Sequence, residues 1–183
     1  KLEEAIAAYN KALLIKPDFA EAHNNIGAAF QSQGKFEEAS AAYNKALLIK
    51  PDYARAHYNL GITLQELGRL EEAVASYRKA IALIPDYAEA HYNLGNTLQE
   101  LGRSKDAEAS YRKAIALIPD YAEAHSNLGI TLRELGRSKD AEASYRKAIA
   151  LKPDYADAHS NLGVTLQELG KLEAALVQYK KSF

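Results

Sequence analysis

Apolar residues recur at intervals of three and four along the chain, which is the pattern of amphipathic helices. Between residues 88 and 101 the apolar stripe consists of Ala90, Leu94, Leu98 and Leu101. A second stripe follows Gly102 and consists of Ala107, Tyr111, Ala114 and Ile115. Because glycine breaks helices, we predict a helix A that runs to about Leu101 and a helix B from about Ser104 to Leu117.

The residues before this helix A carry the signals of a helix start. Pro85 stops the preceding helix, and Asp86 with Glu89 three residues later resembles a capping box. We therefore expect Asp86 to cap helix A. Two short amphipathic helices cannot bury their apolar faces alone, so stability must come from the stacking of neighbouring pairs.

This helix pair repeats with a period of 34 residues. Proline occurs only at that interval, at Pro17, Pro51, Pro85, Pro119 and Pro153. Histidine does the same at His23, His57, His91, His125 and His159. Two sets of glycines share the period, beginning at Gly27 and at Gly34. The whole chain is therefore one array.

The repeating unit resembles the tetratricopeptide repeat along the entire chain. In the fourth unit the matching residues are Leu128, Gly129, Gly136, Ala141, Tyr145, Ala148 and Pro153. The resemblance implies an all-α, right-handed superhelical solenoid of antiparallel helix pairs. One departure is that histidine, as at His91, stands where the family often has tryptophan.

The register of the repeats predicts the organisation of the chain. We expect an orphan helix B in residues 1–19, followed by repeats at 20–53, 54–87, 88–121, 122–155 and 156–183. The chain begins with lysine rather than methionine, so we expect a segment of a longer protein. Both ends should expose apolar residues, which favours end-to-end self-association. These residues are Leu2, Ile6, Tyr9 and Leu13 at one end and Leu176, Tyr179 and Phe183 at the other.

Differences between the internal copies indicate where function lies. Residues 88–121 and 122–155 differ at only four places, namely Tyr92/Ser126, Asn96/Ile130, Gln99/Arg133 and Ile118/Lys152. The first three fall on one stripe of helix A. A solvated outer face would also vary in this way, but in the family this stripe lines a concave groove. The resemblance therefore implies that the groove binds polypeptide.

Each repeat also places an asparagine next to this stripe, although asparagine is a poor residue for a helix interior. The amide bonds either to a neighbouring helix or to the backbone of an extended peptide, because it offers both a donor and an acceptor. Tyr58 and Tyr92 either rest on the next repeat or anchor a peptide. The candidate site comprises Asn25, Asn59, Asn93, Asn127, Asn161, Tyr58, Tyr92, Asn96, Gln65, Gln99, Arg133, Glu66 and Glu100.

Two subtypes of the family can be compared with these residues. The segment Ala156–Gly163 is similar to the repeat arm of O-linked N-acetylglucosamine transferases, in which such asparagines hold substrate polypeptide. Chaperone adaptors instead bind a terminal carboxylate with lysines and an arginine, and of the corresponding residues only Arg55 is basic. Glu66, Glu100 and their equivalents should make the groove acidic. We therefore expect it to prefer neutral or basic extended segments.

Composition argues against other classes of function. The formal net charge of −1 argues against nucleic acid as a partner, and the absence of cysteine excludes thiolate metal sites. Basic pairs such as Arg112-Lys113 lie on the outer face of helix B, where Glu108 and Glu142 are placed for i,i+4 ion pairs with Arg112 and Arg146. We expect no catalytic constellation, cofactor, metal or membrane span in this chain. The sequence identifies no compartment, and a cytoplasmic one is favoured.

Overall fold

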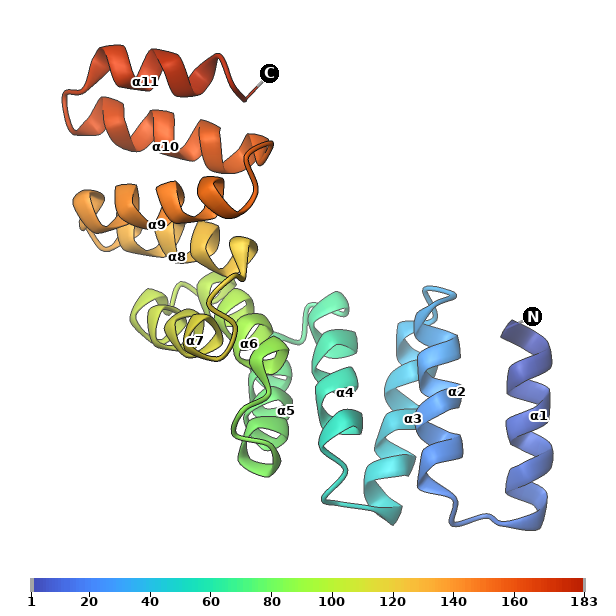
Figure 1. Cartoon of the computed structure of the whole chain (residues 1–183). Helices are drawn as coiled ribbons and strands as arrows, with labels where there is room; N and C mark the ends of the chain where they lie inside the picture. Colours follow the sequence, from blue (N-terminus) through green and yellow to red (C-terminus); the bar gives the residue numbers. More distant parts are fainter. Residues whose placement is uncertain (1, 183) are drawn as a thin grey trace. The chain divides into compact units, whose positions relative to one another are not determined.

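The computed structural model describes residues 2–182, which form eleven α-helices and no β-strand (Figure 1). The predicted all-α fold of paired helices is therefore confirmed. The helices are α1 (Leu2–Ile15), α2 (Ala20–Gln31), α3 (Phe36–Ile49), α4 (Ala54–Glu66), α5 (Leu70–Leu83), α6 (Ala88–Glu100), α7 (Ser104–Leu117), α8 (Ala122–Glu134), α9 (Ser138–Leu151), α10 (Ala156–Glu168) and α11 (Leu172–Tyr179).

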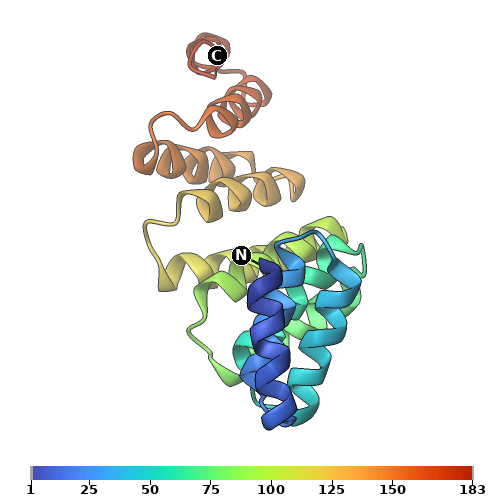
Figure 2. The same cartoon turned by 90° about the vertical axis from the view of Figure 1, so that its right-hand side faces the viewer.

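The helices fall into two compact units, Lys1–Ala90 and His91–Phe183. In each unit a helix A packs on its own helix B, as α2 does on α3 and α8 on α9. Within a unit, helix B also packs on the next helix A, as α1 does on α2 and α9 on α10. Figures 1 and 2 both show α8, α9, α10 and α11 following one another as a stack. The apolar faces of α2, α3, α8 and α9 are thus covered by helices that precede and follow them.

The turn from helix A to helix B is closed by glycine. Gly102 has a φ of 70°, in the left-handed region that favours glycine. Its N–H donates to the Gln99 carbonyl at 2.9 Å, and the Arg103 N–H donates to the Leu98 carbonyl at 2.8 Å. These two bonds form a Schellman motif, which ends α6 at Glu100 and lets α7 begin at Ser104 as predicted.

The start of helix A differs from the prediction. Asp86 lies in the turn after α5, and α6 begins only at Ala88, so the aspartate is not the residue next to the helix. At the start of α4 and of α8, that residue is Tyr53 or Tyr121, and neither side chain caps the helix. The expectation that Asp86 caps helix A was therefore wrong. The residue next to helix A is instead an aromatic one, as at Tyr53 and Tyr121.

A tyrosine from each helix B forms the centre of each helix pair. Tyr43, Tyr77, Tyr111 and Tyr145 are all 0% exposed. A Cβ at Gly61 of α4 would lie 2.7 Å from Cε1 of Tyr77, and the other helix A glycines in the same register meet their tyrosines in the same way. The glycine is therefore required so that the ring can lie directly against helix A.

The repeated histidine holds the Pro-Asp turn against helix A. The Nε2 atoms of His57, His125 and His159 donate to the carbonyl oxygens of the prolines six residues earlier, each at 2.9 Å. At His23, burial lowers the pKa of the imidazole. These bonds give the histidine a packing role. No group of three metal-binding side chains occurs among residues 2–182.

Ion pairs link neighbouring helix pairs in the second unit. Arg112 Nη2 lies 2.9 Å from Glu108 Oε1, and the equivalent Arg146–Glu142 distance is 3.0 Å, so both predicted i,i+4 pairs are confirmed. Each glutamate also contacts a basic residue in the next A–B turn. Those contacts are Arg137–Glu108 and Lys171–Glu142, each at 2.7 Å. The Lys171 ammonium is the main reason that the pKa of Glu142 is lowered.

The buried tyrosines predict loss of stability at alkaline pH. Burial raises the pKa of Tyr43, Tyr77, Tyr111 and Tyr145 far above the ordinary value. The unfolded chain ionises these hydroxyls near pH ~10, whereas the folded chain keeps them protonated. Above that pH the unfolded state therefore binds fewer protons, and stability falls as pH rises. Below it the contribution of the tyrosines is fully present.

We expect the melting temperature to stay level up to about pH 9 and to fall steeply above about pH 10. Circular dichroism would measure the helix content, and near-ultraviolet absorbance would measure tyrosinate. The buried tyrosines should ionise only as the helices are lost. Ionisation of all twelve tyrosines while the helices persist would contradict this expectation.

Candidate functional site

The predicted site residues all lie on the A helices, α2, α4, α6, α8 and α10. In the first unit the asparagines connect two of these helices. Asn59 Nδ2 on α4 donates to Asn24 Oδ1 on α2 at 3.1 Å, and Asn24 Nδ2 donates to Asn25 Oδ1 at 3.3 Å. Asn24 is 2% exposed. At Asn59 the amide therefore has the first of its two predicted roles, a bond to the neighbouring helix.

The second unit contains the same connection with different acceptors. Asn127 Nδ2 on α8 donates to Asn96 Oδ1 at 2.9 Å and to Tyr92 Oη at 3.2 Å, both on α6. Tyr111 Oη also donates to Asn96 Oδ1 at 2.8 Å. Asn93, next to Tyr92, is half-buried, and it too has an interaction partner. Asn59 and Asn127 are thus part of the contact between successive A helices within each unit.

Tyr58 and Tyr92 rest on the tyrosine that precedes the next helix A. The ring centroids of Tyr58 and Tyr87 are 4.8 Å apart, and those of Tyr92 and Tyr121 are 4.7 Å apart. Burial raises the pKa of Tyr87 to about 12 and also raises the pKa of Tyr92. Both predicted anchors are half-buried, and Tyr92 also bonds to the next A helix through Asn127. Their role as ligand contacts stays a prediction.

The glutamines at the next position on the stripe accept hydrogen bonds from the buried tyrosines. Gln65 Oε1 accepts from Tyr77 Oη at 3.2 Å. Gln99 Oε1 accepts from Tyr111 Oη at 2.9 Å and from Thr131 Oγ1 of the next repeat at 3.3 Å. In the fourth repeat Arg133 replaces this glutamine, and the buried Tyr145 hydroxyl has no hydrogen-bond partner. An arginine offers only donors, so it cannot accept the tyrosine proton.

Acidic side chains follow the same edge of the A helices. Glu66 and Glu100 are exposed at the ends of α4 and α6. Glu134, at the end of α8, accepts from Gln99 Nε2 at 3.3 Å and from Ser104 Oγ at 3.0 Å. The carboxylates thus border the predicted binding stripe, although Glu134 also serves the packing of α8 on its neighbours.

A pocket of 240 Å³ lies between α8 and α10 in the second unit. It is lined by Ser126, Asn127, Ile130, Tyr155, Asp157, Ser160 and Asn161. Only Asn127 and Asn161 of these were predicted as site residues. Ser126 and Ile130 are among the positions that vary between the internal copies, whereas the sequence pattern did not single out Tyr155 as a site residue. The signal that could have found the pocket is the loss of an aromatic ring at Ser126 opposite the constant Tyr155.

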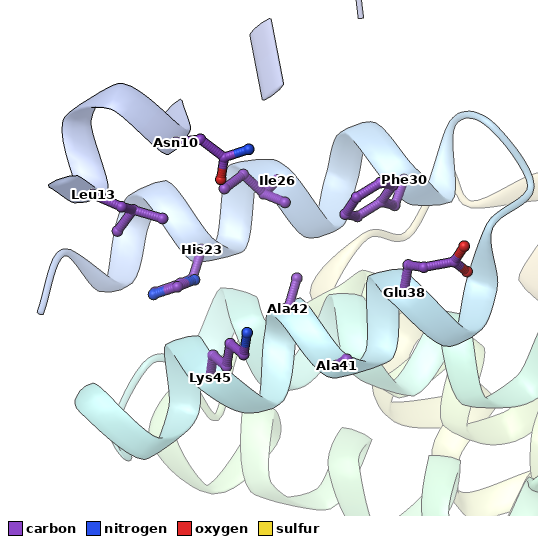
Figure 3. A pocket seen from close by; sticks show the side chains of 9 residues that line it. All are labelled: Asn10, Leu13, His23, Ile26, Phe30, Glu38, Ala41, Ala42 and Lys45. Carbon is purple, nitrogen blue, oxygen red and sulfur yellow. The ribbon is translucent and has the colours of Figure 1, made fainter. Parts of the chain in front are cut away.

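Other depressions lie on the side of the chain formed by the B helices. Figure 3 shows one of 280 Å³, where side chains from α1, α2 and α3 meet, among them Leu13, His23 and Phe30. A second, of 440 Å³, is lined by α7, α8 and α9 and includes Ile115, His125 and Leu132 at the equivalent repeat positions. Because both occupy the same place in the repeat, these depressions are a general product of stacking helix pairs.

Sequence comparisons agree with this geometry. A family profile described as "TPR repeat" matches residues 1–34, 31–68 and 65–102. Profiles described as "Tetratricopeptide repeat" match residues 86–154 and 144–177. The chain belongs to the tetratricopeptide-repeat family. No curated protein sequence matches it at a significant level.

Solved tetratricopeptide-repeat structures share the fold over most of the chain. A crystal structure of MamA has a TM-score of 0.83 at 30% identity, covering 86% of this chain and 92% of its own. The structure of YrrB, described as a TPR protein with an unusual peptide-binding site, has a TM-score of 0.85 at 27% identity and covers 96% and 90%. MamA from Desulfovibrio magneticus RS-1 has a TM-score of 0.85 at 24% identity, covering 89% and 92%.

None of the helices in residues 2–182 combines the length and the apolar character that crossing a membrane requires.

The unpaired Tyr145 hydroxyl yields a test of the glutamine network. Changing Arg133 to glutamine restores the acceptor that Gln99 supplies one repeat earlier. We expect the free energy of unfolding to rise by about 1 kcal/mol, because a buried hydroxyl gains a hydrogen bond. Urea denaturation followed by circular dichroism measures this change.

The matched control is the reverse change, Gln65→Arg, which removes the acceptor of Tyr77 Oη. It should lower the free energy of unfolding by about 1–3 kcal/mol. If both substitutions shifted stability in the same direction, the glutamine would not be the determinant.

Proposed function

We propose that this chain is a protein–protein interaction module that binds an extended polypeptide along the exposed edge of its A helices, which form a concave groove in a right-handed superhelix. The observation that carries the proposal is the α8–α10 pocket, which places an aromatic ring, amides and a carboxylate at one surface. The peptide-binding site named for YrrB, a structural neighbour at 27% identity, supports the same assignment.

The Asn161 amide is the group best placed to bind peptide backbone. Asn59 and Asn127 donate to the preceding A helix, but the Asn161 amide makes no hydrogen bond within residues 2–182. It is half-buried at the pocket. One side-chain amide presents a donor and an acceptor, as a peptide unit does, so it can bind backbone of any sequence. The nearby carboxylates favour neutral or basic segments.

The parent protein that we propose is larger than this chain. The likeness of Ala156–Gly163 to the arm of O-linked N-acetylglucosamine transferases favours a substrate-presenting arm of a glycosyltransferase. The alternative is a stand-alone scaffold that assembles other proteins. In both cases the chain itself contributes binding and not catalysis. A catalytic domain elsewhere in the parent sequence would decide between the two.

Alanine substitution tests the proposed role of the asparagines. Asn161→Ala should weaken binding of array-selected peptides about two- to tenfold, because one hydrogen bond contributes about 0.5–1.5 kcal/mol. Its melting temperature should not change. Asn44→Ala, on the exposed side of α3, is the matched control and should leave binding unaltered.

A second variant, with Asn59, Asn93 and Asn127 all changed to alanine, tests the rest of the row. Its melting temperature must be measured as well, because Asn59 and Asn127 also connect helices. Undiminished binding in both variants would refute the asparagine mechanism. Tight, salt-insensitive binding of acidic C-terminal peptides would refute the charge preference.

Self-association is a second candidate function, favoured by exposed apolar residues at both ends. Leu2 on α1 and Leu176 on α11 are exposed, whereas Ile6, Tyr9, Leu13 and Tyr179 are half-buried. Phe183 lies outside the described residues. If the ends stack, the mass measured by light scattering should rise with concentration and fall when a polar capping helix is appended. An unchanged mass would exclude stacking.

A further inference from the structure

Two successive contacts between A helices in the second unit differ in one respect that bears on ligand binding. The α6–α8 contact contains Tyr92, and the α8–α10 contact contains Ser126 at the same repeat position. Two neighbours of this position keep their residue type, since Tyr121 corresponds to Tyr155 and Asn127 to Asn161. The chain therefore contains its own comparison of a filled and an unfilled site.

In the filled site the Tyr92 ring has three defined partners. Its centroid lies 4.7 Å from that of Tyr121, with 34° between the ring planes, and 6.0 Å from that of the buried Tyr111. Its hydroxyl accepts a hydrogen bond from Asn127 Nδ2 at 3.2 Å. The ring therefore occupies the space bounded by these three residues. Offset contacts of this kind are a favoured arrangement for aromatic side chains.

In the unfilled site the equivalents of these partners are present without the ring, namely Tyr145, Tyr155 and Asn161. Ser126 is 1% exposed, and it lines the 240 Å³ pocket together with Tyr155 and Asn161. The Asn161 amide has no tyrosine hydroxyl to bind. Ile130 replaces the amide of Asn96 in the pocket wall, so the wall is more apolar than in the filled site.

We propose that the pocket between α8 and α10 binds a tyrosine side chain of the bound polypeptide, in the position that Tyr92 takes one repeat earlier. The inference rests on the proposed function and specifies its ligand. The incoming ring packs on Tyr155 and against Ile130, and its hydroxyl accepts from the Asn161 amide. The acidic Asp157 lies at the pocket and can accept a backbone N–H of the same peptide.

Basic side chains fit this pocket less well than an aromatic ring. Lys152 Nζ already lies 4.9 Å from the centroid of Tyr155, and it is also 3.8 Å from Glu123 Oε1. The equivalent residue beside Tyr121 is the uncharged Ile118. A second cation at Tyr155 would be repelled by this ammonium group. An aliphatic side chain would fill space but leave the Asn161 amide unpaired.

The test uses amino-acid analogues as probes and isotope-labelled full-length chain. N-acetyl-tyrosinamide should shift the NMR signals of the Asn161 side-chain amide in a saturable manner. N-acetyl-leucinamide and N-acetyl-argininamide should bind at least about tenfold more weakly. They lack the aromatic contact and the hydroxyl hydrogen bond, and the loss of both lowers affinity by at least that factor. Equal binding by either of these probes would overturn the proposal.

Three variants locate the site. Ser126→Tyr copies the sequence of the preceding repeat and should abolish the saturable shift, whereas Ser126→Ala leaves the pocket open and should keep it. Changing Tyr92 to serine together with Asn96 to isoleucine should create a second site, which doubles the number of probe molecules bound. Retained binding in Ser126→Tyr, with its helix content intact by circular dichroism, would overturn the proposal.

Pairs of peptides with tyrosine or alanine distinguish the tyrosine pocket from the general peptide-binding function. If array peptides bind and replacement of their tyrosines by alanine changes nothing, the tyrosine pocket is wrong and the interaction module stands. If no peptide binds but N-acetyl-tyrosinamide saturates the Asn161 signals, the pocket is supported and the extended-peptide function is wrong.

Discussion

Each helix pair depends on the contact between a helix B tyrosine and a helix A glycine. A Cβ atom added to the glycine would lie only 2.6–2.7 Å from Cε1 of the tyrosine ring. Only glycine therefore lets the two helices approach this closely. The buried hydroxyl then needs an acceptor, since an unpaired one costs about 1–3 kcal/mol. That acceptor is a glutamine in three of the four fully buried cases, which couples packing inside a pair to the surface shared with the next pair.

The polar stripe on helix A therefore contributes to helix packing, whatever ligand it also binds. Asn96, Gln99 and Tyr92 all belong to one hydrogen-bonded network that joins three helices. One repeat later, serine, isoleucine and arginine replace all three types of side chain. The result is an unpaired Tyr145 hydroxyl, an amide at Asn161 without a bond and a pocket beside Tyr155. Groups released from the network in this way are the ones available to a ligand.

The sequence alone was sufficient for the helices, because periodicity, proline and glycine act locally. Helix B from Ser104 to Leu117 and the ion pairs of Glu108 and Glu142 were predicted correctly. Asp86 was not a cap, because Tyr87 lies between it and the start of α6 at Ala88. The variable stripe was found from the internal copies. The pocket was not, because Ser126 and Tyr155 are 29 residues apart and meet only when successive A helices pack.

The near identity of the third and fourth repeats has an evolutionary consequence. The two duplicated units differ at only four positions. A gene that lengthens by copying one of them therefore gains either a filled site, as at Tyr92, or an unfilled site, as at Ser126. Only two or three codon changes separate these forms, and none of them touches the tyrosine–glycine contact. The ligand pocket can thus shift by one repeat along the array, or several pockets can arise, without a change in the packing of the helix pairs.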